Sequence, residues 1–257
     1  SWSTPQQINT PPSGHYSQGC DIRTGPNGEV YVIWAAPVAG VPFTEDFAGF
    51  GRSTDGGVNW TVTENAYDMN GIRGIFSSKS SIRVNGFPRI DVDRSGGVRN
   101  GWIYTVASEK NISPAGSDPD IIMHRSSNGG TTWSPGIRVN QDPLNNGKFQ
   151  WFPAIRVDEA GGVNIVYYDD RYTQSDSSEV YISRSLDGGN SWSDIQVSDH
   201  RFKPQSIGVA GIATGYQGDY IGMTSSNGNL FPIWMDNFSG IYNAWTAPVL
   251  ISTYPLN

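Results

Sequence analysis

The sequence predicts an all-β fold, organised as a β-propeller of four-stranded antiparallel blades. Three observations lead to this prediction: a hairpin pattern that recurs four times, a nine-residue turn motif that recurs three times, and the overall composition. The chain of 257 residues holds 31 glycines and 16 prolines, and aromatic residues make up 12% of it. Glycine and proline disfavour helix interiors whereas aromatic residues suit strands, so short strands joined by tight turns are favoured over helices.

The hairpin pattern combines a short strand around an isoleucine, a glycine-containing turn, and a second strand rich in Val, Ile and aromatic residues. Its copies are QGCDIRTGPNGEVYVIW (18–34), FPRIDVDRSGGVRNGWIYTV (87–106), FPAIRVDEAGGVNIVYY (152–168) and GDYIGMTSSNGNLFPIW (218–234). The aligned isoleucines, Ile22, Ile90, Ile155 and Ile221, recur roughly every 65 to 68 residues. A fixed period of this length is typical of repeat architectures such as propellers.

Two further strands complete each repeat. In the second and third repeats a third strand is predicted at 120–127 and 179–186, and a fourth at 132–140 and 191–198. Each unit is thus a four-stranded antiparallel meander, which is the construction of a propeller blade. A β-sandwich is the alternative fold. The chain is read as one propeller domain, or the C-terminal part of one, with blades at 18–64, 86–140, 151–198 and 217–252.

The number of blades stays open between two readings. SWSTPQQIN at 1–9 matches a fourth strand, so it is expected to be the outer strand of a neighbouring or closing blade. Four blades could close on themselves, with residues 1–9 completing the last one. The favoured reading is that the chain is the C-terminal part of a longer propeller, because Ser1-Trp2 corresponds to the end of the turn motif.

The turn motif occurs as RSTDGGVNW (52–60), RSSNGGTTW (125–133) and RSLDGGNSW (184–192). The Asp can accept hydrogen bonds from backbone N–H groups of its own turn, the glycines supply positive φ, and the Trp packs beneath. Asn128 replaces the Asp in the second copy, which preserves an acceptor but removes a charge. The motif is therefore predicted to be structural, and its residues are Ser53, Asp55, Gly57, Trp60, Ser126, Asn128, Gly130, Trp133, Ser185, Asp187, Gly189 and Trp192.

The motif S-x-D-x-G-x-x-W resembles the Asp-box, or BNR repeat, of sialidase-like β-propellers of the secreted bacterial type. The resemblance runs through essentially the whole chain, and it implies a six-bladed propeller of which about two N-terminal blades are missing here. It also implies three arginines on a substrate carboxylate, a Tyr–Glu pair and an Asp acid/base. That full set cannot be assigned in this sequence. Arg89 is as well explained by a pair with Asp21 across blades, and two explanations are open for Arg23 and Arg156: they line the channel, or they pair with Asp91.

Charge and cysteine content exclude several classes. The net charge of −7 and the lack of a Lys/Arg cluster argue against nucleic acid as a partner. The sequence contains no long apolar run, so it predicts no membrane span. Cys20 is the single cysteine, so an internal disulfide is excluded. No metal site and no cofactor are predicted. Acidic loops such as 117–120 offer the oxygen ligands that Ca²⁺ takes, but no calcium-binding motif is present.

The candidate site is the loop-rich mouth of the propeller, on the face opposite the turn motifs. The densest polar cluster there is YYDDRY at 167–172. Its structural explanation is a local Asp–Arg ion pair at a strand end. The functional explanation is a carboxylate and a guanidinium that face a ligand. The candidate catalytic residues are Asp169, Asp170, Arg171 and Asp219, and the candidate substrate-binding residues are Trp151, Tyr172, Gln217, Tyr216, Arg156 and Asp236.

Two functions remain open at this stage. One is a secreted sialidase-like propeller that recognises or hydrolyses glycans at the central mouth, as a glycoside hydrolase of exo-sialidase type if it is an enzyme. The other is a non-catalytic glycan- or protein-binding propeller module of a secreted or cell-surface assembly. The expected partners are accordingly a carbohydrate or a protein surface, together with the missing N-terminal blades.

Overall fold

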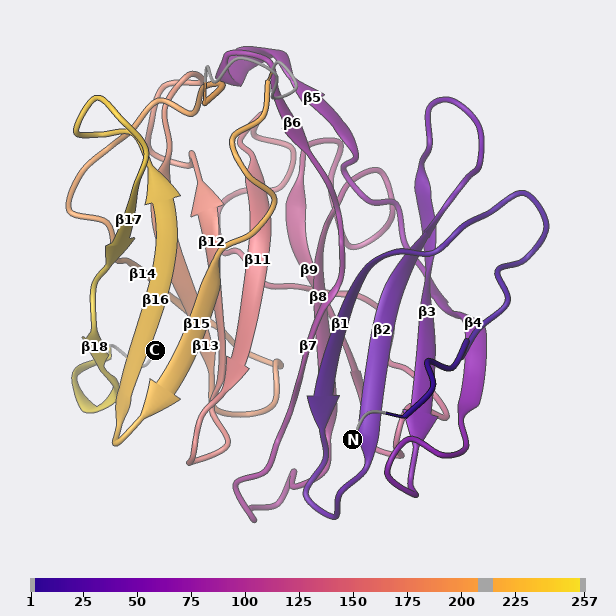
Figure 1. Ribbon diagram of the computed structural model, residues 1–257. Coiled ribbons are helices and arrows are strands. Elements are labelled where there is room, and N and C mark those ends of the chain that lie inside the picture. Colours follow the sequence, from indigo (N-terminus) through magenta and orange to yellow (C-terminus); the bar gives the residue numbers. More distant parts are fainter. Residues whose placement is uncertain (1–2, 208–214, 255–257) are drawn as a thin grey trace.

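The computed structural model describes residues 3–207 and 215–254, and within them the chain is all-β (Figure 1). Four antiparallel sheets follow one another along the sequence, each formed by consecutive strands. The only helical elements in the described part are two 3₁₀ turns, η1 (Ser77–Lys79) and η2 (Ile251–Thr253). No helix there is long and apolar enough to cross a membrane.

The first three sheets have the predicted meander order. The first contains β1 (Gln18–Thr24), β2 (Val30–Pro37), β3 (Glu45–Ser53) and β4 (Thr61–Asp68). The second contains β7 (Arg89–Val92), β8 (Ile103–Glu109), β9 (Asp120–Ser126) and β10 (Ile137–Arg138). The third contains β11 (Gln150–Val157), β12 (Val163–Asp169), β13 (Glu179–Ser185) and β14 (Ser193–Gln196).

The fourth sheet differs from the other three at its outer edge. It contains β15 (Gly222–Ser226), β16 (Asn229–Asp236), β17 (Asn243–Thr246) and β18 (Val249–Leu250). Both β17 and β18 pair with β16, so they share the third position of the meander. Pro248 separates them, and proline cannot donate a ladder hydrogen bond. No described strand takes the fourth position.

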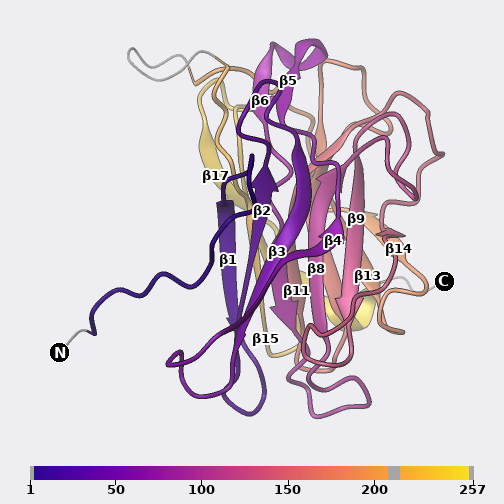
Figure 2. The same cartoon turned by 90° about the vertical axis from the view of Figure 1, so that its right-hand side faces the viewer.

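Residues 3–9 form no strand, which differs from the expectation that residues 1–9 supply an outer strand of a blade. They contact the β3–β4 turn and β4 of the first sheet instead of completing the last one. The Gln6 amide donates to Val58 O at 3.4 Å, and the Asn9 amide donates to Glu64 Oε2 at 3.3 Å. Figure 2 shows this segment running away from the body of the sheets. Ser1 and Trp2 lie outside the described residues.

Three apolar cores lie between consecutive sheets. Alternation along the strands places one set of side chains on each face, as the hairpin pattern predicts. Tyr31 and Ile33 pack against Ile90 and Ile103 between the first and second sheets. The other two cores are centred on Tyr104, Val106, Ile155, Ile165 and Tyr167, and on Val166, Tyr168, Ile182, Leu230 and Trp234. Consecutive sheets therefore stack face to face, as the blades of a propeller do.

Polar links join the inner strands β1, β7 and β11. Asp21 accepts the backbone N–H of Ile90 at 3.2 Å, and Asp91 accepts that of Val157 at 2.7 Å. The cross-blade ion pairs expected from the sequence are confirmed: Arg89 Nε lies 3.3 Å from Asp21. Arg23 Nε and Arg156 Nη1 lie 3.5 Å and 3.7 Å from Asp91. Asp21 of β1 and Asp91 of β7 thus each hold the next inner strand in register.

The turn motifs have the predicted hydrogen bonding. Asp55 Oδ1 accepts the backbone N–H groups of Val58 and Asn59 at 3.1 Å and 2.9 Å. Asn128 accepts the N–H of Thr132 at 3.0 Å, so the amide does replace the carboxylate as an acceptor. These turns lie at the end of the sheets opposite the β5–β6 hairpin (Figure 1).

The hairpin of β5 (Gly74–Phe76) and β6 (Ile82–Val84) is a separate two-stranded sheet that lies across one end of the molecule (Figure 1). The sequence predicted only a loop here. Phe76 and Ile82 pack into the core of the third and fourth sheets. Lys79 is fully buried, and its Nζ donates to Asp170 Oδ2 at 2.7 Å and to Ser175 O at 2.6 Å. The hairpin therefore connects the first two sheets to the third across this end.

Candidate functional site

A cavity of about 390 Å³ lies beside the β5–β6 hairpin, where β1 begins and where the chain enters β7 and β15. This is the mouth end of the inner strands, opposite the turn motifs. The residues that line it are Gln18, Gly19, Pro42, Phe43, Arg73, Gly74, Ile75, Arg83, Val84, Asn85, Phe87, Asp219 and Tyr220. A smaller crevice continues from it past Arg89 to Phe152.

Three arginines surround this space, and they differ in how they are held. Arg73 Nη1 donates to the Tyr16 hydroxyl at 2.6 Å and to Gln18 Oε1 at 2.7 Å, with no ion-pair partner in the described residues. Arg83 lies 3.5 Å from Asp219, and half of its side chain is exposed. Arg89 is held by Asp21. The guanidinium groups of Arg73 and Arg83 thus line the cavity, and that of Arg89 lies at its edge.

Asp219 is the carboxylate of the cavity, and it is positioned from both sides. Its Oδ2 accepts the Tyr216 hydroxyl at 2.6 Å, and its Oδ1 accepts the Asn85 amide at 3.1 Å. The hydrogen bond to Asp219, together with burial, raises the pKa of the Tyr216 hydroxyl. Tyr216 is therefore a neutral donor at physiological pH, and the carboxylate accepts from it.

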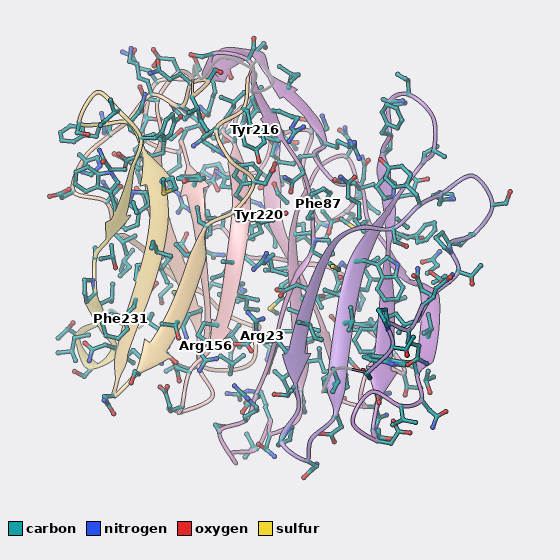
Figure 3. All side chains as sticks on the ribbon, in the orientation of Figure 1. Arg23, Phe87, Arg156, Tyr216, Tyr220 and Phe231 are labelled. Atoms are coloured by element: carbon teal, nitrogen blue, oxygen red, sulfur yellow. The ribbon has the colours of Figure 1, made fainter. Side chains whose placement is uncertain are left out.

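Aromatic rings form the apolar part of the wall. In Figure 3, Phe87, Tyr216 and Tyr220 approach the space between β15 and β1. Tyr220 is 57% exposed, and the Arg89 guanidinium lies 5.6 Å from the centre of its ring. Phe43 lies beneath Arg73, with 5.3 Å between the guanidinium and the ring centre. Exposed rings beside guanidinium and amide groups can bind the apolar face of a sugar ring and its polar edge.

Backbone geometry at the starts of the inner strands shapes this wall. Gly19 has φ +67°, and the register of β1 shifts between Gln18 and Asp21. A Cβ at Gly19 would come within 2.2 Å of the Phe87 ring. Phe152, at the equivalent position of β11, also has a positive φ of 52°, with the corresponding register shift. Only a residue without a side chain allows β1 to approach Phe87 this closely.

Two buried glutamates accompany the segment that carries Arg73. Glu45 Oε2 accepts the backbone N–H of Gly86 at 2.7 Å, and Glu109 Oε2 accepts that of Asn70 at 3.3 Å. Burial raises the pKa of Glu45 to about 7 and that of Glu109 to about 8. The second oxygen of each carboxyl is buried without a hydrogen-bond partner. Neither group reaches the cavity, so both support its wall from within.

The structure places the YYDDRY cluster inside the third sheet, away from the cavity. Asp169 and Arg171 are buried and lie 2.7 Å apart, and Arg171 also pairs with Asp194 at 2.5 Å. Asp170 pairs with Lys79. Every charged group of the cluster has a partner within the protein, which agrees with the structural explanation. Tyr172, which is 72% exposed, does not line the cavity.

Of the other predicted site residues, the structure brings together Asp219 and Tyr216 only. Trp151 is part of the apolar core, and Asp236 is fully buried, accepting from His200 Nε2 at 2.9 Å and Trp234 Nε1 at 2.7 Å. Arg156 donates to Ser225 Oγ at 3.1 Å lower on the inner wall (Figure 3). Gln217 is buried, and neither polar atom of its amide has a partner.

Sequence reasoning missed Arg73, Arg83 and Phe87 as site residues. Arg73 and Arg83 lie in the segment between the first and second repeats, which has no counterpart elsewhere in the chain. Two arginines that flank apolar residues in a segment outside the repeats are the signal that could have found them. In the described residues no group of three or more His, Cys, Asp or Glu side chains is arranged to hold a metal ion.

No protein-family model and no curated protein sequence matches the chain. Solved structures do. A Dyadobacter fermentans protein of unknown function has a TM-score of 0.59 at 14% identity over 99% of this chain and 66% of its own. A Penicillium chrysogenum α-L-arabinanase, solved with arabinobiose, has a TM-score of 0.60 at 16% identity, covering 95% of this chain and 68% of its own.

A Trypanosoma rangeli sialidase, solved with sialic acid, has a TM-score of 0.52 at 16% identity over 86% of this chain and 34% of its own. Identities this low show a shared fold alone. The chain spans about two thirds of the length of the first two structures and about one third of the sialidase. The sialidase-like propeller expected from the sequence is supported as a fold.

Proposed function

We propose that the chain is part of a glycan-binding propeller whose ligand occupies the cavity at the mouth. The observation that carries this proposal is the convergence of Arg73, Arg83, Asp219 and Tyr220 on one space of about 390 Å³. A cavity of this size accommodates one or two sugar units. The similar arabinanase and sialidase structures were solved with sugars, which supports a saccharide as the class of ligand.

A sugar with a negative charge fits this cavity best. Arg73 has no carboxylate partner in the described residues, and Arg83 shares its partner Asp219 with Tyr216 and Asn85. A ligand carboxylate would accept charge-assisted hydrogen bonds from the guanidinium groups of Arg73 and Arg83. Tyr220 would bind an apolar face of the ring. Action outside the cell, and a protein surface as an alternative partner, stay predictions.

Hydrolysis is the second candidate, and the Tyr216–Asp219 pair favours it. A hydroxyl 2.6 Å from a carboxylate is an arrangement from which proton transfer can start. Glycoside hydrolysis by two carboxylates needs a pair at a defined separation. Asp219 is the one carboxylate that lines the cavity in the described residues. Binding without turnover is therefore the function that this geometry supports best.

The test is a glycan array followed by calorimetry on the acidic glycans that bind, 3′-sialyllactose among them. Arg83→Ala should weaken binding about tenfold or more, because a hydrogen bond to a charged group is lost. Arg201→Ala is the matched control, because Arg201 is exposed and pairs with Glu179 away from the cavity. Equal binding by wild type and Arg83→Ala would overturn the proposal. Release of sugar from a chromogenic sialoside would decide for hydrolysis.

We also propose that the four sheets are blades of a larger, six-bladed propeller. Phe231, Ile233 and Met235 alternate along β16 and are 37%, 50% and 38% exposed (Figure 3). Equivalent positions in the first three sheets, such as Tyr31 and Ile33, form the core with the next sheet. The length of the first two similar structures, half as long again as this chain, supports two additional blades.

A further inference from the structure

A second hollow, of about 440 Å³, lies at the opposite end of the sheets from the mouth. It is formed between the outer strand of the first sheet and the turn motif of the second. Its walls include Phe50, Arg52, Asp55, Asn59, Trp60, Thr61 and Thr63 on one side, and Gly129, Gly130 and Thr131 on the other. Hereafter these residues are called the outer groove.

Arg52 is the feature that distinguishes the outer groove. It is the first residue of RSTDGGVNW, so Arg125 and Arg184 are its counterparts in the other two motifs. Arg184 is buried against Asp158 and Asn164. Arg125 donates to Gly188 O and to Asn190 Oδ1, the latter at 2.9 Å. Both counterparts thus have acceptors within the protein.

Arg52 has none of these partners. Its side chain reaches Gly129, the counterpart of Gly188, but its Nε is buried without a hydrogen-bond partner, and no ion pair in the described part of the chain involves it. Thr131 stands where the third motif has Asn190, and its hydroxyl donates to Asn128 O. Gly25 stands where the third repeat has Asp158. The side chain of Glu29 fills the space beside Gly25, and its charge interacts with that of Arg52, but no ion pair joins the two in the described residues. Arg52 thus lacks the two acceptors that hold its counterparts.

The other groups of the outer groove suit a sugar. Thr61 and Thr63 are exposed and lie opposite Arg52 and Phe50 on the neighbouring strand, which directs their side chains to the same face. Trp60 adds a half-buried ring. Asp55 also borders the space, but its oxygens already accept from Ser53, Val58 and Asn59.

We propose that the outer groove is a second saccharide site, in which Arg52 pairs with the carboxylate or sulfate of an acidic sugar and the threonines bind its hydroxyls. The two Nη groups of Arg52 are not buried as its Nε is and have no hydrogen-bond partner in the described residues, so an anionic ligand group in the groove would pair with them. The two ends of the molecule would then hold different segments of one acidic polysaccharide, or of two.

The experiment titrates the chain with tetragalacturonate as the carboxylate probe, a chondroitin sulfate tetrasaccharide as the sulfate probe, and neutral cellotetraose. NMR shifts of the Arg52 Nε–H and Trp60 Nε1–H report on the site, and calorimetry gives the affinity. One acidic probe or both should move these signals, and binding should weaken as salt is raised. Equal binding of cellotetraose, or no shift with either acidic probe, would overturn the proposal.

Two variants test the mechanism. Arg52→Ala should weaken binding about tenfold, and Thr131→Asn should weaken it as well by restoring the acceptor that occupies Arg125. Arg94→Ala is the matched control, an arginine at the same end that lines a separate shallow hollow. Arg83→Ala should leave the groove signals unchanged. Trp60 signals that shift in folded Arg52→Ala as they do in the wild type, or that no longer shift in Arg83→Ala, would contradict the assignment, and melting temperatures show which variants are folded.

Discussion

At the residue scale, the two buried glutamates behind the mouth are the groups most sensitive to pH. Neither is paired with a lysine or arginine in the described residues, and burial raises the pKa of Glu45 from 4.5 to about 7. The native state therefore binds more protons than the unfolded state between these two values. The free energy of unfolding should accordingly fall as pH rises through this window.

Glu45→Gln tests this linkage. Glutamine keeps an oxygen that accepts the Gly86 N–H, but it cannot ionise. Above pH 7 the variant should therefore be more stable to unfolding than the wild type, in which Glu45 becomes a buried charge. The expected gain at pH 8 is on the order of 3 kcal/mol, at about 1.4 kcal/mol per pKa unit. Urea unfolding at pH 5 and pH 8 measures it. Glu159→Gln, at an exposed position, is the control, and the same pH dependence in wild type and Glu45→Gln would contradict the account.

Still at the residue scale, Gly19 fixes the distance between β1 and Phe87. Gly19→Ala combines a positive φ with a Cβ that would overlap the Phe87 ring. We expect a loss of about 1–3 kcal/mol in the free energy of unfolding, and weaker ligand binding because Phe87 must move. Gly28 has a similar positive φ, but a Cβ there would meet open space. Gly28→Ala therefore measures the cost of the backbone conformation alone, without the overlap with Phe87. Equal losses in the two variants would show that Phe87 is not involved.

At the element scale, the β5–β6 hairpin carries the mouth arginines, and Lys79 anchors it. Lys79→Met should leave the buried Asp170 carboxylate without its cationic partner, with the Phe149 N–H as a remaining donor, and cost about 3–5 kcal/mol. The double variant Lys79→Met/Asp170→Asn should recover part of this loss, because the unpaired charge is removed. Thermal and urea unfolding of the single and double variants measure the coupling. A double variant no more stable than Lys79→Met would contradict the proposed role of the ion pair.

The elements themselves were largely predictable from the sequence. Strand alternation around Ile22, Ile90, Ile155 and Ile221 indicated the four hairpins, and the structure confirms them as β1–β2, β7–β8, β11–β12 and β15–β16. The β5–β6 hairpin was not predicted, because its packing depends on Trp151 and Phe202, which are distant in sequence. A sequence repeat predicts only the strands that the blades have in common. The β5–β6 hairpin lies outside the repeats, so the repeat pattern could not predict it.

The site was less predictable for a related reason. An Asp–Arg cluster at a strand end, such as 169–171, has the same composition whether it faces solvent or closes a buried ion pair. The structure shows the buried ion pair, whereas Asp219 and Tyr216 meet because the chain turns between them. Arg73 and Arg83 reach the cavity only through the fold of the unmatched segment.

At the scale of the whole molecule, the open face of the fourth sheet should behave as an incomplete interface. Ile233→Lys places a charge among Phe231, Ile233 and Met235. We expect it to reduce self-association of the chain and its binding of a hydrophobic dye, because an exposed apolar sheet face favours both. Sedimentation velocity and dye fluorescence measure these effects. Thr224→Lys, on the neighbouring β15 opposite Phe231, should act in the same direction.

A wild-type chain that stays monomeric and binds no dye would contradict this expectation. In a longer chain that supplies the additional blades, Ile233→Lys should instead lower the melting temperature, because the lysine would then be buried between sheets. An unchanged melting temperature there would argue against a further blade on this face.

The central claim is that an acidic glycan binds at the mouth, among Arg73, Arg83, Asp219 and Tyr220. Chemical-shift mapping during a titration with 3′-sialyllactose, or with the best acidic glycan of the array, tests it most directly. Saturable shifts are expected at the guanidinium groups of Arg73 and Arg83 and at the rings of Phe87, Tyr216 and Tyr220. Shifts confined to other regions, or none with any glycan of the panel, would contradict it.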